Sequence, residues 1–254
     1  MSQFGQNQNI YVSSKQRIGT DASNFVVIFN PALRNPSKVS VIDCQIPVSW
    51  APFDELNNKI AFAFQSDPET VLTASIPTDR YYASFDDLGT AIKTAMNAVA
   101  SDKFESVTNN ENTFQFTWTA TEPFQFRLPD SILHDNSYEM LGLGCYSPTS
   151  YATSITAPCT ATLMKTEAVY VVSNTIPSST TFSTFPNGSQ VLCKVPVTGN
   201  YGAVLSYEDK SDQNTIPLDR SIVNEMSFSL IDDRGFPLEL RGRNWSISIV
   251  YNYD

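Results

Sequence analysis

The sequence predicts an all-β protein, an antiparallel β-sandwich of the single jelly-roll type with one short helix and an elaborating insertion. The 254 residues include 12% aromatic but only 17% charged residues, a balance typical of strands and polar loops. About a dozen short segments are strand-like, and in many of them apolar residues alternate with period two, as in half-buried strands. No repeat period is present, which excludes propellers and solenoids. A jelly roll is the common antiparallel form for this many strands.

The N-terminal quarter predicts a tail and two strands. Residues 1–9 are rich in Gln and Asn without apolar periodicity, so we expect a flexible tail, with the jelly roll formed by residues 10–254. Phe25–Phe29 is a continuous apolar run, which predicts a strand covered on both faces and ended by Asn30-Pro31. The next strand changes the phase of its alternation at Val41–Ile42, which predicts a β-bulge or bend there.

The middle of the chain predicts two strands and the single helix. Ile60–Phe64 and Leu72–Ile76 alternate with period two. Ser84 is a helix-capping residue followed by two acids, and apolar residues then recur at helical spacing as far as Val99. We expect this apolar stripe to be core packing. Residues 81–143 are expected to form an insertion between jelly-roll strands or a small subdomain.

Two aromatic-rich regions predict hairpins. Phe114–Trp118 and Phe124–Leu128 alternate strictly and are separated by a short polar segment. Near the C-terminus, Met226–Leu230 and Trp245–Tyr251 alternate on either side of a turn at Asp232–Gly235. We expect the two strands of each region to pair with each other.

Polar segments separate the remaining strands. Tyr146–Ala161 is rich in Ser, Thr and Pro and is expected to be a surface loop. Tyr207–Gln213 is charged and is expected to be exposed. Ala168–Val172 and Val191–Val195 are strand-like runs between them.

The charge and hydropathy of the chain limit its partners. The formal net charge is −10, and the 16 Lys and Arg residues are scattered, which argues against direct nucleic-acid binding. No apolar run approaches the ~20 residues of a membrane helix, so we expect no membrane insertion. The N-terminus has no apolar region of a secretory signal, so we expect the protein to be made in a cytosol.

The cysteines and the histidine offer little for catalysis. Cys44, Cys145, Cys159 and Cys193 are far apart in sequence; we favour reduced thiols over disulfides and exclude the paired ligands of a zinc site. His134 is the only histidine and lies in a polar stretch, so we expect a surface residue rather than a catalytic one.

Other catalytic and cofactor patterns are missing as well. The sequence contains neither a nucleophile-elbow motif nor a phosphate-binding glycine loop. The acidic pairs Asp86-Asp87 and Asp232-Asp233 are explained by a helix cap and a turn. We therefore predict no enzyme activity and no cofactor.

Short motifs spread over most of the chain form a recognisable pattern. They are Tyr11–Arg17, Ser23–Phe25, Val41–Ser49, Tyr81–Asn97, Phe114–Phe116, Met140–Gly142, Phe228–Leu238 and Asn244–Ile249. The ending, in which Asp232 to Gly235 is followed by Trp245-Ser246, is the most specific of them. Together these motifs resemble the penton proteins, the vertex capsid proteins of virophages, polinton-like viruses and related large eukaryotic dsDNA viruses. Trp50–Phe53 departs from the family pattern.

The resemblance implies a structural capsid protein located in the virion. It would form the homopentameric plug at the fivefold vertices of an icosahedral capsid, beside a double-jelly-roll major capsid protein. Other minor capsid proteins or a vertex fibre would be further partners. The residues expected to serve in interfaces or packing are Arg17, Trp50, Arg234, Phe236 and Trp245; core packing of Trp245 and a solvated turn at Arg234 are equally compatible with the sequence.

Three other functions stay open. A minor cementing or spike-base capsid protein would use the same jelly roll with a different symmetry. A carbohydrate-binding β-sandwich module would be a monomer with exposed coplanar aromatics. A sandwich-fold glycosidase would place two carboxylates across a cleft.

Overall fold

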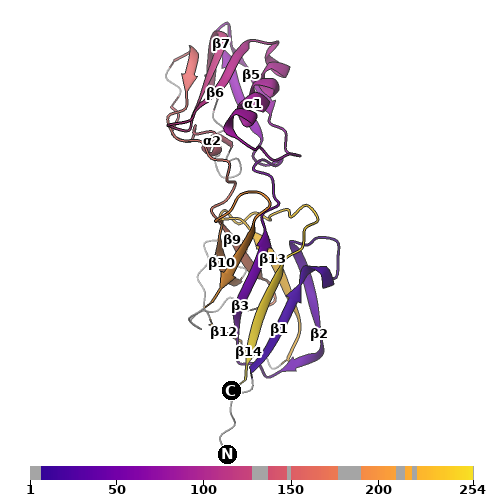
Figure 1. The fold of residues 1–254 in the computed structure, drawn as a ribbon. Helices are drawn as coiled ribbons and strands as arrows, with labels where there is room; N and C mark the ends of the chain where they lie inside the picture. Colours follow the sequence, from indigo (N-terminus) through magenta and orange to yellow (C-terminus); the bar gives the residue numbers. More distant parts are fainter. Residues whose placement is uncertain are drawn as a thin grey trace, which may run out of the picture. The chain divides into compact units, whose positions relative to one another are not determined.

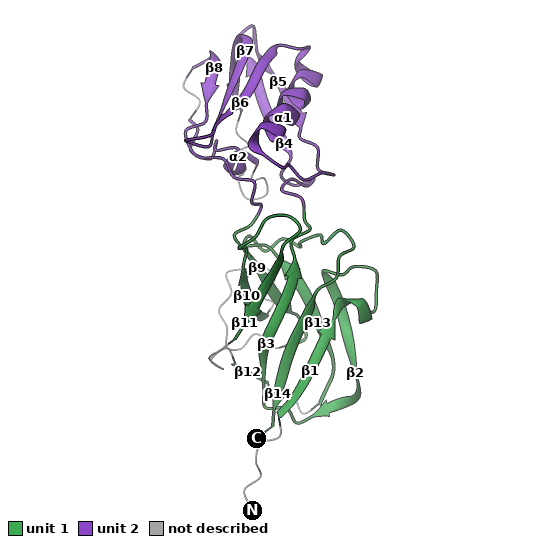
Figure 2. Cartoon of the chain, viewed as in Figure 1, with its two compact units in different colours: residues 1–50, 166–254 green, residues 51–165 purple. Residues whose placement is uncertain are grey.

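The computed structural model describes residues 7–127, 137–147, 150–176, 190–209, 215–218 and 222–253. The chain forms two compact units: residues 1–50 and 166–254 make up unit 1, and residues 51–165 make up unit 2 (Figure 2). Unit 1 contains β1 (Asn7–Ser13), η1 (Ser14–Gln16), β2 (Asn24–Arg34), β3 (Lys38–Pro47), β9 (Ala168–Ser173), β10 (Gln190–Pro196), β11 (Val204–Glu208), β12 (Thr215–Pro217), β13 (Ile222–Ile231) and β14 (Ser246–Asn252). Unit 2 contains β4 (Lys59–Phe64), β5 (Asp67–Ser75), α1 (Phe85–Ala100), β6 (Phe104–Asn110), β7 (Gln115–Phe126), α2 (Ser137–Met140) and β8 (Ala152–Thr156).

Unit 1 is a sandwich of two antiparallel sheets (Figure 1). One sheet has the order β1-β14-β3-β11, with β12 also paired to β3, and the other has the order β10-β9-β13-β2. When β12 is left aside and the strands are numbered along the chain, the two orders become 1-8-3-6 and 5-4-7-2. This interleaving of strands between two sheets is that of a jelly roll. The predicted fold class is confirmed.

The core of unit 1 lies between its sheets and explains the alternation in the sequence. Val41 and Cys44 of β3 are both buried. Residues on one face of a regular strand are separated by an even number of positions, and these two are separated by an odd number. The pairing of β3 with β14 shifts between Ser248 and Ile249 and leaves Ile42 without a partner. The predicted bulge at Val41–Ile42 is therefore confirmed, and it keeps both halves of β3 facing the core.

Unit 2 is a sheet of order β5-β4-β7-β6, with β8 also paired to β7, and α1 packs against β5 and β6. Its core is rich in rings packed edge to face: the centroids of Phe62 and Phe104 lie 5.1 Å apart, and those of Trp118 and Phe126 lie 4.9 Å apart. The predicted strands in β4 and β5 are present. The buried residues of unit 2 form a cluster that shares no member with the core of unit 1.

Helix α1 begins as its sequence predicts. The hydroxyl of Ser84 accepts a hydrogen bond from the Asp87 amide at 3.2 Å, which caps the helix. Leu88 and Met96 are fully buried, which confirms the core role of the stripe, whereas Val99 at its margin is exposed. No described helix is long and apolar enough to cross a membrane.

The expected domain boundaries need correction. The insertion is residues 51–165 rather than 81–143, because β4 pairs with β7 and β5 pairs with β4, so that both strands belong to the sheet of β7. Asn7–Asn9 of the expected tail of residues 1–9 instead pair with β14 as part of β1. Residues 1–6 of that tail lie outside the described residues.

The strand at Phe25–Phe29 differs from the prediction in two ways. It continues through Asn30-Pro31, a cis peptide bond, to Arg34, and Ile28 is 58% exposed. The proline is tolerated because the pairing of β2 with β13 is interrupted between Ile28 and Leu33, so that Pro31 removes no ladder bond.

Both predicted hairpins are wrong. Thr119 to Pro123 is part of the single strand β7, at the point where its neighbour changes from β6 to β4. Strands β13 and β14 lie in opposite sheets, although the turn at Asp232–Gly235 is present: the Gly235 amide donates to the Asp232 carbonyl at 3.1 Å. Period-two alternation identifies a half-buried strand but does not identify its partner.

Two polar segments contain strand residues. The predicted loop Tyr146–Ala161 includes β8, which pairs with β7. In the segment Tyr207–Gln213, which is expected to be exposed, Tyr207 belongs to β11 and packs partly buried against the core of unit 1. Polar composition concealed both, because each strand has only one face on the core. His134 lies outside the described residues.

Candidate functional site

The acidic pairs of the sequence serve local structure. The Asp87 carboxylate pairs with Arg80, and this hydrogen bond lowers the pKa of Asp87. The buried Asp232 accepts hydrogen bonds from the amides of Arg234 at 3.0 Å and Phe236 at 2.8 Å, as aspartates in turns do. Among the described residues, no three His, Cys, Asp or Glu side chains form a group that could hold a metal ion.

The turn at Asp232–Gly235 brings two of the predicted residues together. The Arg234 guanidinium lies 3.5 Å from the Asp232 carboxylate and 5.4 Å from the centre of the Phe236 ring. Both Arg234 and Phe236 are partly exposed. They form a small cationic and aromatic surface that is held in place by the buried Asp232.

A second link fixes the same turn to the start of β9. The Asp233 carboxylate accepts a hydrogen bond from the Glu167 amide at 3.0 Å, and the Asp233 amide donates to the Thr166 hydroxyl at 3.1 Å. The surface formed by Arg234 and Phe236 is therefore anchored from two directions within unit 1.

Arg17 lies away from this turn and connects residues near the N-terminus with a residue near the C-terminus. Its guanidinium donates to the Ser14 carbonyl at 2.7 Å, to the Asn244 side-chain oxygen at 2.8 Å and to the Thr20 carbonyl at 3.2 Å. The Ser14 hydroxyl also accepts from the Trp245 amide at 3.0 Å. Arg17 thus stabilises the turn after β1 against the segment before β14.

The two predicted tryptophans are core residues. Trp245 is buried, packs edge to face on Phe25 at 5.7 Å and donates its indole N–H to the Ala22 carbonyl at 2.7 Å. Trp50 is also buried in the core of unit 1. Of the two roles that the sequence left open for Trp245, the structure shows packing.

Exposed apolar residues that the sequence analysis missed lie on the lateral sides of the sandwich. Tyr11 of β1 is 74% exposed, and Ile18 and Ile28 beside it are more than half exposed; we call this set the β1–β2 edge. On the opposite side, where β10 and β11 lie together, Tyr201 is exposed and Val204 is 61% exposed; we call this pair the β11 edge. The strands β1 and β2, and the strands β10 and β11, can be followed in Figure 2.

Only a solved topology reveals these edges. In the sequence, Tyr11 and Val204 look like any outward-facing residues of a strand. The structure shows that their strands, β1 and β11, are the two end strands of one sheet. The end position leaves backbone groups and apolar side chains together at the surface, and such edges favour pairing with another chain.

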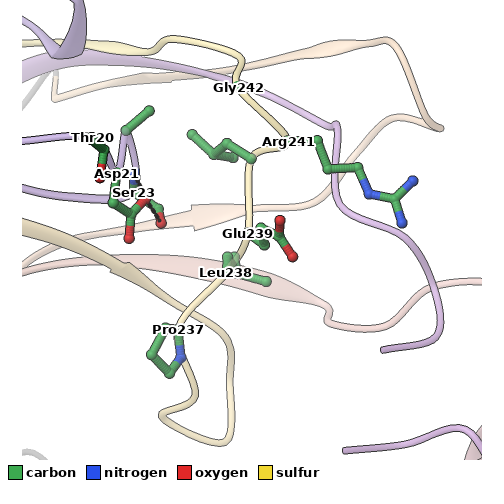
Figure 3. Close-up of a pocket in the computed structure, with 10 residues that line it drawn as sticks. Thr20, Asp21, Ser23, Pro237, Leu238, Glu239, Arg241 and Gly242 are labelled. Carbon is green, nitrogen blue, oxygen red and sulfur yellow. Dashed lines mark hydrogen bonds between the residues drawn. The ribbon is translucent and has the colours of Figure 1, made fainter. Parts of the chain in front are cut away.

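A surface pocket of about 430 Å³ lies between residues 20–23 and 237–242 of unit 1 (Figure 3). The Asp21 carboxylate is held by the amide and hydroxyl of Ser23 at 2.8 and 2.7 Å. Figure 3 shows the Arg241 side chain extending away from the other lining residues. The charged groups of this pocket do not converge as those of a catalytic centre would.

No family model and no curated protein matches this chain. Among solved structures, the crystal structure of selenomethionine-labelled mavirus penton protein matches with a TM-score of 0.53 at 12% identity, over 97% of this chain and 99% of that chain. The chain shares its fold with the mavirus penton protein. The penton-like fold agrees with the resemblance found in the sequence, and at this coverage the match extends over both units.

Proposed function

We propose that this chain is a penton, a structural capsid protein without enzyme activity that assembles as a homopentamer at the fivefold vertices of an icosahedral dsDNA virus. The observation that supports the proposal is the penton-like fold along nearly the whole chain. In this role the protein resides in the virion, and its partners are further copies of itself and a double-jelly-roll major capsid protein.

The two lateral edges of unit 1 provide a physical basis for a ring. A ring of identical subunits needs two different surfaces on each subunit, because every contact is head to tail. The β1–β2 edge and the β11 edge lie on opposite sides of the sandwich and carry different exposed apolar residues, such as Tyr11 and Val204. Apolar and aromatic side chains of this kind are enriched in the buried centres of interfaces.

Native mass spectrometry with negative-stain imaging tests the assembly. The expected result is a closed ring of five copies. A stable dimer or trimer would contradict the proposal and favour a cementing or spike-base capsid protein. A monomer that binds glycans would favour a carbohydrate-binding module.

A pair of valine substitutions tests the edge. Val204→Asp places a charge in the proposed contact and should abolish the ring. Val71→Asp is the matched control, because Val71 is a similarly exposed strand valine (51%) in unit 2 and lies outside both edges. Retention of the ring by Val204→Asp, or its loss in both variants, would contradict the role of the β11 edge.

The same variants test the location of the protein in assembled particles. When the chain is co-expressed with the major capsid protein of its virus, we expect wild type and Val71→Asp at the fivefold positions of the assembled shell, and we expect Val204→Asp to be absent from them. Occupancy of another symmetry position by the wild-type protein would refute the vertex assignment.

A further inference from the structure

The four cysteines, which are far apart in the sequence, form two close pairs in space. Cys44 of β3 and Cys193 of β10 come from opposite sheets and are both buried in the core of unit 1. Cys145 and Cys159 belong to unit 2, where Cys145 is exposed and Cys159 is partly exposed. All four are free thiols in this structure.

The backbone segments that carry Cys145 and Cys159 touch. The Cys159 amide donates to the Gly142 carbonyl at 3.0 Å. Gly142 has a φ of +78°, and a Cβ atom added to it would lie 2.2 Å from the Cys159 carbonyl oxygen. Only glycine permits this approach, which brings the turn that contains Cys145 against Cys159.

Both segments are also fixed from outside the pair. Ala157 and Ala161 lie on either side of Cys159. The Ala157 amide donates to the Phe116 carbonyl of β7 at 2.8 Å, and the Ala161 amide donates to the carbonyl of Phe114, just before β7, at 2.7 Å. On the other side, the Leu143 amide donates to the Tyr138 carbonyl of α2 at 2.6 Å, and the Tyr146 amide donates to the Leu143 carbonyl at 2.9 Å. The positions of both cysteines are therefore set by the fold rather than by a chance meeting of loose loops.

The side chains meet as well. A hydrogen bond with the Cys159 thiol is the largest cause of the raised pKa of Cys145, and charge repulsion between the two sulfurs adds to it. Contact between the two side chains is the first requirement for a sulfur–sulfur bond.

We propose that Cys145 and Cys159 form a reversible oxidation site, at which an intramolecular disulfide closes on the surface of unit 2. The oxidant is a small-molecule disulfide such as glutathione disulfide. The inference rests on these two residues alone and does not depend on the proposed function.

The reaction balances as two thiol–disulfide exchanges. The thiolate of one cysteine first attacks a sulfur of glutathione disulfide; the oxidant's S–S bond breaks, and one glutathione leaves as a thiolate that takes up a proton. The second cysteine, as its thiolate, then attacks the protein sulfur of the mixed disulfide and releases the other glutathione. Two protein thiols are oxidised, and one glutathione disulfide is reduced to two thiols. The second step is intramolecular and therefore fast relative to the first.

The buried pair provides a control within the same molecule. A side-chain hydrogen bond with Cys193 likewise raises the pKa of Cys44, so the two thiols are also close. Cys44 and Cys193 are only 0% and 5% exposed, however, and the oxidant cannot reach them in the folded protein. A comparison of the pairs separates the effect of access from that of proximity.

The disulfide would have a local mechanical effect. It closes a loop that begins at Cys145, contains β8 and ends at Cys159. Restricting this loop disfavours its opening, so hydrogen exchange of the β8 amides should slow by on the order of tenfold after oxidation. Exchange in unit 1 should stay unchanged.

The test uses the full wild-type chain treated with glutathione disulfide, quenched with an alkylating agent and digested without reduction. We expect a disulfide-linked peptide pair that contains Cys145 and Cys159, about 2 Da lighter than the two thiol peptides. A reductant should reverse the link. Cys44 and Cys193 should remain unlinked and react with the alkylating agent only after unfolding.

Single variants identify the intermediate. Cys159→Ser should stop at a stable glutathione adduct on Cys145, which the wild type should not accumulate. Stable adducts in wild type without a link, links between separate chains, or oxidation of the Cys44–Cys193 pair at the same rate as the exposed pair would each overturn the proposal.

Discussion

Neutralising Asp54 should destabilise unit 2 much more than neutralising Lys165, although both changes remove the same ion pair. The two residues lie near the two ends of unit 2 and form a salt bridge. Their environments differ: the Lys165 side chain is 4% exposed, and the Asp54 side chain is 35% exposed. The free energy of unfolding should therefore depend on which charge is left behind.

The magnitudes follow from that difference. Asp54→Asn leaves a buried ammonium without its counter-ion, which costs about 3 kcal/mol. The asparagine oxygen can still accept the hydrogen bond that Asp54 receives from the Leu56 amide at 2.9 Å, so the variant isolates the charge. Lys165→Met leaves a carboxylate that water reaches, and the loss should be about 1 kcal/mol. The two variants should differ roughly 30-fold in the unfolding equilibrium.

Hydrogen exchange across a urea series measures this difference by region. Amides of β4 and β7 report on unit 2, and amides of β3 and β14 in unit 1 serve as the internal control. The double variant completes a cycle and gives the pair's own interaction energy. If Lys165→Met were as destabilising as Asp54→Asn, the argument from burial would be refuted.

Three further predictions concern single side chains. Ser84→Ala removes the N-cap of α1 and should cost about 1 kcal/mol, seen as faster exchange in the first turn of the helix. Burial raises the pKa of Tyr82 to about 12, so the stabilisation that comes from this shift is complete below pH ~10 and is lost as the pH rises from about 10 to about 12. The urea midpoint of the wild type should fall over this pH range, and this part of the fall should be absent in Tyr82→Phe. Trp245→Phe leaves the Ala22 carbonyl without its 2.7 Å donor and should cost about 2 kcal/mol by urea unfolding, and wild-type stability of this variant would contradict the packing role of Trp245.

How far the sequence predicted the fold depends on the physical range of each pattern. The Ser84 cap and the bulge at Val41–Ile42 involve contacts near in sequence or a change of phase within one strand, and both are present. Strand pairing is a long-range property. The partner of Phe228 on β13 is Phe25 of β2, and nothing in the alternation of either strand encodes that choice, so the two hairpins were predicted wrongly.

The candidate surface residues show the same limit. Trp245 is a large apolar residue in a strand, and such residues serve equally in a core or an interface until its neighbours are known. Tyr11 and Val204 became candidates only when β1 and β11 were found at the ends of their sheet. The cysteine pairs were hidden for the same reason, because Cys145 and Cys159 meet through the contact of Leu143 with α2 and that of Ala157 with β7.

The two hydrophobic cores are separate, so changes in unit 2 do not affect the packing of unit 1. The insertion leaves unit 1 after Trp50 and returns at Thr166, and the pair between Asp54 and Lys165 ties its two ends together. The exposed apolar residues of the β1–β2 and β11 edges all belong to unit 1. Because the two hydrophobic clusters share no residue, substitutions in the core of unit 2 leave the packing behind those edges intact. Unit 2 can therefore vary in sequence, or form the proposed disulfide, without altering the surfaces of the proposed ring.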